Sequence, residues 1–292
     1  MTASAQPSPN TRAASDLAGL QALPHTERLP VMFVGHGSPM NAIEDNDWRR
    51  TWQALGRELR QRGTQPSLIL CISAHWITQG WHLTAMGQPP TIHDFGGFPQ
   101  ALFDQQYPAP GAPAVARAIS ADVHQPGGDR PLGLDEREWG LDHGTWSVLK
   151  PMFPEADIPV IQLSMDYSRP PAEHFALGRE LARLRERGVL IVGSGNVVHN
   201  LRAVRRDVPN NQAYDWAIEF DRTVAEHIGA GRLASLVDFQ QQGAVAQLSH
   251  PTWDHYLPLL YAAGAVHEQE APRYFNEGFQ AASISMRSVL WG

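Results

Sequence analysis

Two apolar runs of strand length each lead to a histidine at their carboxyl end. Residues 31–34 read Val-Met-Phe-Val and lead directly into Gly35, His36 and Gly37. Residues 68–72 read Leu-Ile-Leu-Cys-Ile and lead to His75 three positions later. Short continuous apolar runs bounded by turn residues are typical of buried strands. The sequence therefore predicts two buried strands, each of which ends close to an imidazole.

The segment between these runs predicts an amphipathic helix. Its apolar residues recur at helical spacing: Trp48, Trp52, Leu55 and Leu59. Gly63 then ends the helix. Two strands joined by a helix pair in parallel, so their carboxyl ends lie at the same edge of the sheet. We therefore expect His36 and His75 at one edge, on strands that could be neighbours, where ligands bind in open α/β sheets.

The same alternation continues along the chain. Residues 158–164 and 189–192 predict two more strands, and residues 171–187 predict the helix between them. The later strand leads through a Gly-Ser-Gly turn to His199. We interpret residues 29–292 as a single α/β domain with a mostly parallel central sheet flanked by helices and a site at the carboxyl ends of the strands. Residues 1–28 lack any sustained period and are predicted to be a disordered N-terminal tail.

Composition excludes several classes of function. The net charge of the 292 residues is −7 and no basic run is present, which argues against a nucleic-acid partner. Cys71 is the single cysteine, so no intramolecular disulfide can form, which fits a reducing cytoplasm. No stretch approaches the ~20 continuous apolar residues of a membrane span. The N-terminus also lacks the pattern of a secretory signal, and we expect a cytoplasmic protein.

Several of the 13 histidines fall at strand ends or in turns rich in Pro and Gly. These are His36, His75, His199 and His255. Imidazole is a good ligand for zinc, iron and copper, and ligands dispersed over a rigid sheet are more typical of a catalytic than of a structural metal site. Spacing alone leaves a metal site and ordinary core or loop histidines as equal alternatives.

Residues 77–113 lack a regular period and are broken repeatedly by proline and glycine. Long irregular segments in compact domains tend to be binding loops or lids. This one contains side chains that could line a pocket for a planar ligand: His93, Asp94, Phe95, Phe98 and Tyr107. A plain surface loop is the alternative, and no substrate-binding residue can be assigned.

Five motifs occur in one order along the chain: GHGSPM, SAHW, GLDHGTW, GSGNVVHNL and HPTWDHYLPLL. This series resembles the 4,5-DOPA extradiol dioxygenase-like family, a group of the LigB-type class III ring-cleaving dioxygenases. The resemblance extends from residue 31 to the C-terminus. It implies an α/β fold and a mononuclear non-haem Fe(II) site. It also implies oxidative opening of a small catechol, L-DOPA or another, by O2.

The resemblance also implies roles for particular histidines. His36, His75 and His255 would be metal ligands. His199 would be either a fourth ligand or an acid–base residue, and His143 would be a catalytic histidine beside the metal. Zn(II) binds nitrogen sites more tightly than Fe(II), so purified protein is expected to carry zinc readily. The partners would be the catechol and O2, in a monomer or small homo-oligomer.

Two other functions remain open at this stage. A zinc-dependent hydrolase also uses a histidine-rich site with an open position, although no His-Glu-x-x-His motif is present. A non-catalytic metal-binding protein on the same scaffold would need neither His143 nor His199, yet both residues are present.

Overall fold

The structure, a computed structural model, describes residues 23–292. Most of the predicted N-terminal tail, residues 1–22, lies outside the described residues. The remaining six residues of that segment contact the body of the protein. The backbone N–H of Thr26 donates to the carbonyl of Glu186, and the Arg28 guanidinium lies 2.7 Å from the Glu186 carboxylate.

A central sheet organises the fold, with the strand order β4-β3-β5-β2-β6-β1-β10-β7. The strands are β1 (Val31–Gly35), β2 (Leu68–Ile77), β3 (His82–Thr84), β4 (Gly133–Asp135), β5 (Val160–Met165), β6 (Val189–Gly195), β7 (Pro272–Phe275) and β10 (Ser288–Trp291). The four central strands β5, β2, β6 and β1 pair in parallel, whereas β10 and β7 join one edge antiparallel. The predicted mostly parallel sheet is confirmed.

The strands that lead to His36 and His75 are not direct neighbours, because β6 lies between β1 and β2 and pairs with both. Two glycines of β6 let a neighbouring segment approach its backbone closely. A Cβ at Gly193 would lie 2.4 Å from the carbonyl oxygen of Pro258, and one at Gly195 would lie 2.1 Å from that of His255. The central strand therefore lacks side chains where the turn carrying His255 packs against the sheet.

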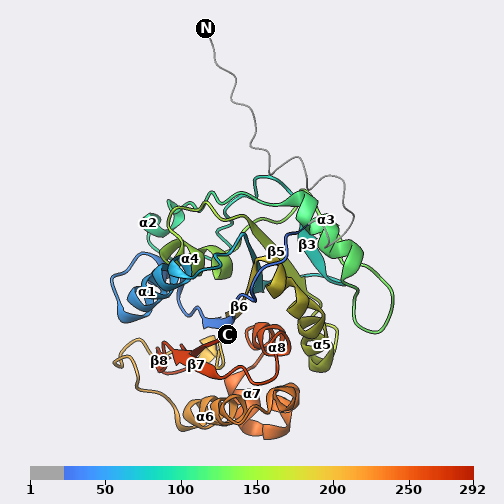
Figure 1. The fold of residues 1–292 in the computed structure, drawn as a ribbon. Coiled ribbons are helices and arrows are strands. Elements are labelled where there is room, and N and C mark those ends of the chain that lie inside the picture. Colours follow the sequence, from blue (N-terminus) through green and yellow to red (C-terminus); the bar gives the residue numbers. More distant parts are fainter. Residues whose placement is uncertain (1–22) are drawn as a thin grey trace.

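Helices cover both faces of the sheet (Figure 1). One face packs against α1 (Asp47–Gln61) and α4 (His143–Met152). The other packs against α5 (Pro171–Leu181) and α8 (Leu257–Gly264). Side chains alternate along each strand between the two cores, so Ile69 and Cys71 of β2 lie on the α1/α4 side, whereas Leu70 lies on the α5/α8 side.

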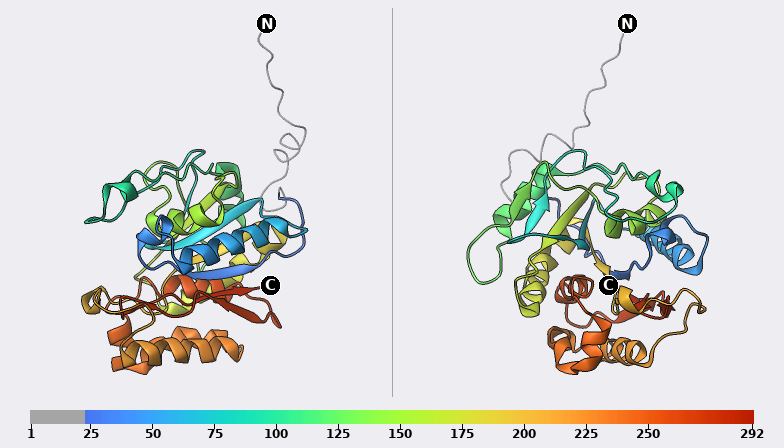
Figure 2. Two further views of the ribbon diagram at one scale, coloured as in Figure 1. Left: turned by 90° about the vertical axis from the view of Figure 1, so that its left-hand side faces the viewer. Right: turned by 180° about the vertical axis from the view of Figure 1, so that it is seen from behind.

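A further helical layer packs outside α8 and lies at the bottom of both views in Figure 2. It consists of α6 (Asp215–Gly229), the 3-10 segment η7 (Leu233–Gln242) and α7 (Ala244–Ser249). The predicted helix over 171–187 is divided, because α5 ends at Leu181 and the chain continues as the 3-10 segment η5 (Ala182–Arg187).

The remaining elements are short: η4 (Pro39–Ala42), α2 (Gln100–Phe103), α3 (Pro113–Asp122), η6 (Leu201–Ala203), β8 (Phe279–Gln280) and β9 (Ile284–Ser285). Within residues 23–292, none of the helices has the length and apolar character that crossing a membrane requires.

Candidate metal centre

Three histidines converge at the carboxyl edge of the sheet. His36 follows β1, His75 lies near the end of β2, and His255 precedes α8. Each offers one ring nitrogen, and the three nitrogens lie within 4.8 Å of one another. Nε2 of His36 lies 3.4 Å from Nε2 of His75. Residues that are far apart in the sequence therefore bring three imidazoles to one point.

The hydrogen bonds of Ser194, on β6, assign the tautomer of His36. The Ser194 hydroxyl donates its single proton to the carbonyl of Gly144 at 2.5 Å. Its oxygen lies 3.0 Å from Nδ1 of His36, and it can only accept there, since its proton is already used. Nδ1 of His36 therefore carries the ring proton, and Nε2 has a free lone pair directed toward His75.

Carboxylates make the same assignment for the other two rings. Nδ1 of His255 hydrogen-bonds with the Asp254 carboxylate, and Nδ1 of His75 lies 3.5 Å from Oδ2 of Asp94. An ionised carboxylate only accepts, so the hydrogen bond with Asp254 places the His255 proton on Nδ1. The longer contact with Asp94 favours the same tautomer for His75. In both rings this arrangement leaves Nε2 free. With these tautomers, the lone pairs of three Nε2 atoms face one another. A cation at this point would remove the repulsion between the lone pairs, and ligating histidines typically bind a carboxylate or similar group through their other nitrogen.

Burial keeps the three imidazoles neutral. It lowers the pKa of His36 and of His255 well below the usual value, and the charge of the neighbouring histidines lowers both further. The pKa of His75 is lowered to about 3, again mainly by burial. A neutral imidazole is the form that binds a metal. The donor set therefore fits a divalent ion of the zinc or iron type, which prefers nitrogen ligands.

His143 lies beside this cluster at the start of α4. Its ring centroid is 3.9 Å from that of His75. Nδ1 of His143 is 3.0 Å from Oδ1 of Asp94, at ion-pair distance but without hydrogen-bond alignment. The backbone N–H of His143 donates to the same oxygen at 2.8 Å. Asp94, His75 and His143 thus form a second group of side chains that could hold a metal ion.

His199 has a different relation to the cluster. Its ring stacks on that of His255, with centroids 3.4 Å apart and planes 6° from parallel. Within the described part of the chain, neither three-residue group that could hold a metal includes it. Burial lowers the pKa of His199 to about 4, partly opposed by the charge of Asp254. His199 therefore presents a neutral ring against one of the converging histidines.

The structure shows partners that the sequence patterns did not indicate. Asp94, considered only as a pocket wall, contacts two of the candidate histidines. Ser194, taken as part of a turn, binds a third. A polar residue between two glycines at the end of a strand was the available signal for Ser194. For Asp94, the only signal in the sequence was its position in an irregular segment.

The aromatic residues of the 77–113 segment divide into two groups. The Phe95 ring lies 5.4 Å from the His143 ring, and the Phe98 ring packs against Phe95 at 5.3 Å. Tyr107 is instead fully buried, and its hydroxyl donates to the Phe153 carbonyl at 3.2 Å. Phe95 thus borders the histidine cluster, whereas Tyr107 belongs to the core.

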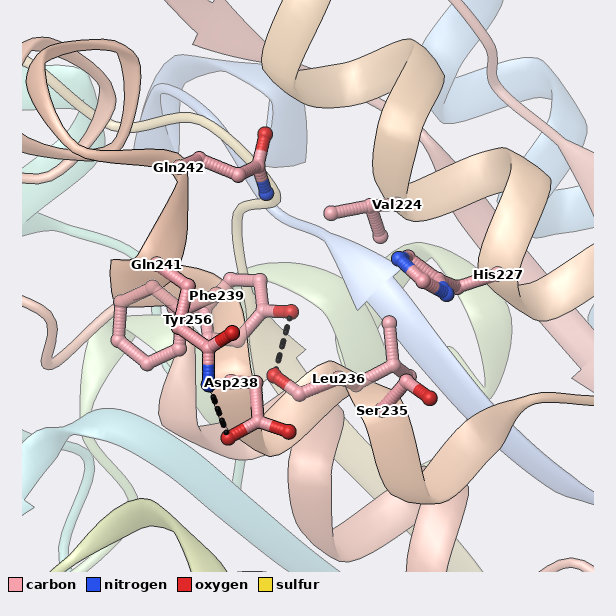
Figure 3. A pocket seen from close by; sticks show the side chains of 9 residues that line it. All are labelled: Val224, His227, Ser235, Leu236, Asp238, Phe239, Gln241, Gln242 and Tyr256. Carbon is pink, nitrogen blue, oxygen red and sulfur yellow. Dashed lines mark hydrogen bonds between the residues drawn. The ribbon is translucent and has the colours of Figure 1, made fainter.

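Two pockets lie outside the histidine cluster. One, of about 340 Å³, lies between α6 and η7 near Tyr256 (Figure 3), and none of the five candidate histidines lines it. The other, of about 520 Å³, is lined by Trp76 and Trp139, whose ring planes are 2° from parallel. Trp76 follows His75 directly, and Nε1 of Trp139 donates to Asp142 at 3.3 Å. The second pocket therefore lies next to the segments that carry the cluster.

Comparison with known proteins gives consistent matches over almost the whole chain. The model of the family described as the catalytic LigB subunit of aromatic ring-opening dioxygenase matches residues 30–288. A protein of Escherichia coli (strain K12) named 4,5-DOPA dioxygenase extradiol is 48% identical over 269 residues, covering 91% of this chain and 95% of that protein. A protein of Beta vulgaris with the same name is 34% identical, covering 88% of this chain and 94% of that protein.

A solved structure also matches this fold. It is the crystal structure of an uncharacterized protein from Escherichia coli K12, with a TM-score of 0.76 and 42% sequence identity. The match covers 91% of this chain and 100% of the Escherichia coli chain. All five candidate histidines lie within the residues matched by the family model.

Proposed function

Because the chain belongs to the LigB family of aromatic ring-opening dioxygenases, we propose that it opens a small catechol with O2 at one Fe(II) ion. The proposed ligands are His36, His75 and His255. The observation that carries this proposal is the convergence of their three nitrogens within 4.8 Å. We take residues 29–292 as the catalytic domain, since the family match spans nearly all of them.

When bound, Fe(II) would supply redox chemistry by accepting both catechol and O2 as ligands and passing electrons between them. Zinc lacks this redox change. What the chain itself contributes is a set of neutral, oriented imidazoles. Three protein ligands leave room for other ligands, as catalytic metal sites require. Ser194, Asp94 and Asp254 hold the rings in position through Nδ1.

Proton transfer is proposed for the two remaining histidines. A catechol loses a proton from a hydroxyl as it binds a metal, and His199 is a neutral base adjacent to the cluster. His143 faces Asp94 through Nδ1, which leaves its Nε2 to exchange a proton with the substrate during ring opening. Histidine suits both tasks because one ring nitrogen of a neutral imidazole accepts a proton and the other donates one.

The bordering aromatic side chains support a planar substrate. Phe95 meets the His143 ring nearly edge-on, with an interplanar angle of 84°. Aromatic side chains beside a few directed polar groups are typical of pockets for small aromatic ligands. Since the Escherichia coli and Beta vulgaris relatives bear the name 4,5-DOPA dioxygenase extradiol, L-DOPA is the first catechol to test. The buried thiol of Cys71 fits a cytoplasmic setting.

An oxygen electrode tests this proposal. Metal-free protein is loaded with Fe(II) under anaerobic conditions and then given air and a panel of catechols. We expect oxygen uptake and a yellow ring-opened product only when both iron and catechol are present. No uptake over the whole panel, together with zinc-dependent hydrolysis of an ester or amide, would establish the hydrolase instead. Metal binding with neither activity would indicate a non-catalytic metal-binding protein.

A further inference from the structure

One carboxylate contacts two histidines with different proposed roles. Oδ2 of Asp94 lies 3.5 Å from Nδ1 of His75, and Oδ1 lies 3.0 Å from Nδ1 of His143. Oδ1 also accepts the backbone N–H of His143 at 2.8 Å. Only 17% of the Asp94 side chain is exposed. Both oxygens are therefore directed at this pair of residues.

The backbone around Asp94 is fixed relative to α4. The N–H of Ile92 donates to the carbonyl of Leu141 at 2.8 Å, and Nε1 of Trp146 donates to the carbonyl of Ile92 at 2.9 Å. These two bonds hold Ile92 against Leu141, which precedes α4, and against Trp146, which lies within α4. Ile92 is two residues before Asp94. The carboxylate is therefore held in place although it lies in an irregular segment.

We propose that Asp94 is a positioning residue that sets the tautomers of His75 and His143 at once. Because a carboxylate that lies 3.0 Å from Nδ1 of His143 and 3.5 Å from Nδ1 of His75 favours a proton on each of these atoms, it leaves Nε2 of His75 free for the metal and Nε2 of His143 free for proton exchange with the substrate. The role at His75 needs only a metal site. The role at His143 rests on the proposed function.

An asparagine at this position separates the two effects. In Asp94→Asn the side-chain oxygen is expected to stay on the backbone N–H of His143, because that donor cannot move. The amide NH2 group then occupies the place of Oδ2 and faces Nδ1 of His75. Two donors cannot face each other, so His75 must shift its proton to Nε2. A ring nitrogen that carries a proton cannot bind a metal.

Nitrogen-15 NMR of metal-free protein reads the tautomers directly. We expect Nδ1–H for both His75 and His143 in the wild type. In Asp94→Asn we expect Nε2–H for His75 and an unchanged His143. Zinc affinity, measured by competition with a chromophoric chelator, should fall about 10- to 100-fold in the variant. The control is Asp104→Asn, an exposed residue of the same segment whose side chain accepts a hydrogen bond from Gln100 at 2.9 Å, and it should match the wild type.

Three results would overturn the proposal. The first is an Nε2–H tautomer of His75 in the wild type, which needs no variant. The second is a folded Asp94→Asn protein, judged by near-UV circular dichroism, in which His75 keeps Nδ1–H. The third is unchanged zinc affinity in that variant. None of these readouts involves ring opening, so a wild type that fails to open catechols but shows the tautomer shift would refute the proposed function alone.

Discussion

Replacing Ser194 with alanine removes the hydroxyl that accepts the Nδ1 proton of His36. Both groups are buried, since Ser194 is 0% exposed and His36 is 1% exposed. A buried donor left without an acceptor costs about 1–3 kcal/mol. The hydroxyl of Ser194 also donates to the carbonyl of Gly144, which lies in the first turn of α4. This carbonyl loses one donor in the variant. The cost of Ser194→Ala therefore falls mainly on His36.

The metal-free and metal-bound proteins should respond differently. Without metal, His36 can move its proton to Nε2 and donate it to Nε2 of His75, 3.4 Å away. That new hydrogen bond offsets most of the lost one. With metal bound, Nε2 is a ligand and the proton must stay on Nδ1, where it has no acceptor. The full cost then weakens metal binding, and we expect zinc affinity to fall about 10- to 100-fold, or about 1.4–2.7 kcal/mol.

Chelator competition measures this change, and thermal unfolding of the metal-free protein measures the stability. Ser120→Ala is the matched control. Ser120 is also buried, and its hydroxyl donates to the carbonyl of Leu132 at 2.5 Å, away from the histidines. Ser120→Ala should lower stability and leave zinc affinity unchanged. Equal zinc affinity in Ser194→Ala and the wild type would refute the assignment of the His36 tautomer.

Three further predictions follow from the same geometry. His255→Ala should lose bound zinc, whereas His143→Ala should keep it and lose about 10²- to 10⁴-fold in ring-opening rate; equal metal loss in both, measured by elemental analysis, would show that His143 is a ligand. His199→Ala should behave like His143→Ala, because its ring lies outside the converging nitrogens, and zinc loss in this variant would contradict that placement. Gly56→Ala should lower the free energy of unfolding by about 1–3 kcal/mol in thermal or urea unfolding, because the new Cβ would lie 1.8 Å from the Met152 carbonyl oxygen. Gly63→Ala is the control, because a Cβ there would have nothing within 4 Å. Equal stability of the two variants would disprove the close contact between α1 and α4.

The parts of the fold that depend on local pattern could be predicted from the sequence. The apolar run before His36 forms β1, and the run before His75 forms β2. The helical period beginning at Trp48 forms α1, which buries Trp48, Trp52, Leu55 and Leu59. Such patterns are visible because each element must bury one face or both.

The order of the strands could not be predicted, because pairing joins segments distant in the chain. Nothing local to β1 or β2 indicates that β6 lies between them. β3 and β4, with three residues each, are too short to show a period. The antiparallel strand β10 pairs with β1 from the far end of the chain.

The histidines of the site could be predicted, but their partners could not. His36 and Ser194 are 158 residues apart, and His143 and Asp94 are 49 apart. Which nitrogen of each ring is free depends on these partners. Sequence patterns therefore predict which imidazoles meet, and only the folded chain shows which nitrogen of each ring is free to bind a metal.

Oxygen-18 labelling tests the central claim most directly, namely that a redox-active metal at this site inserts O2 into a catechol ring. Wild-type protein loaded with Fe(II) or with zinc is given L-DOPA under oxygen-18 gas, and the product is trapped at once by reduction and analysed by mass spectrometry and NMR. The account predicts, for the iron form alone, a ring opened beside the two hydroxyl-bearing carbons and carrying both atoms of one O2 molecule. Labelled product from iron-free zinc protein, or an iron-form product opened without incorporation of oxygen-18, would contradict it.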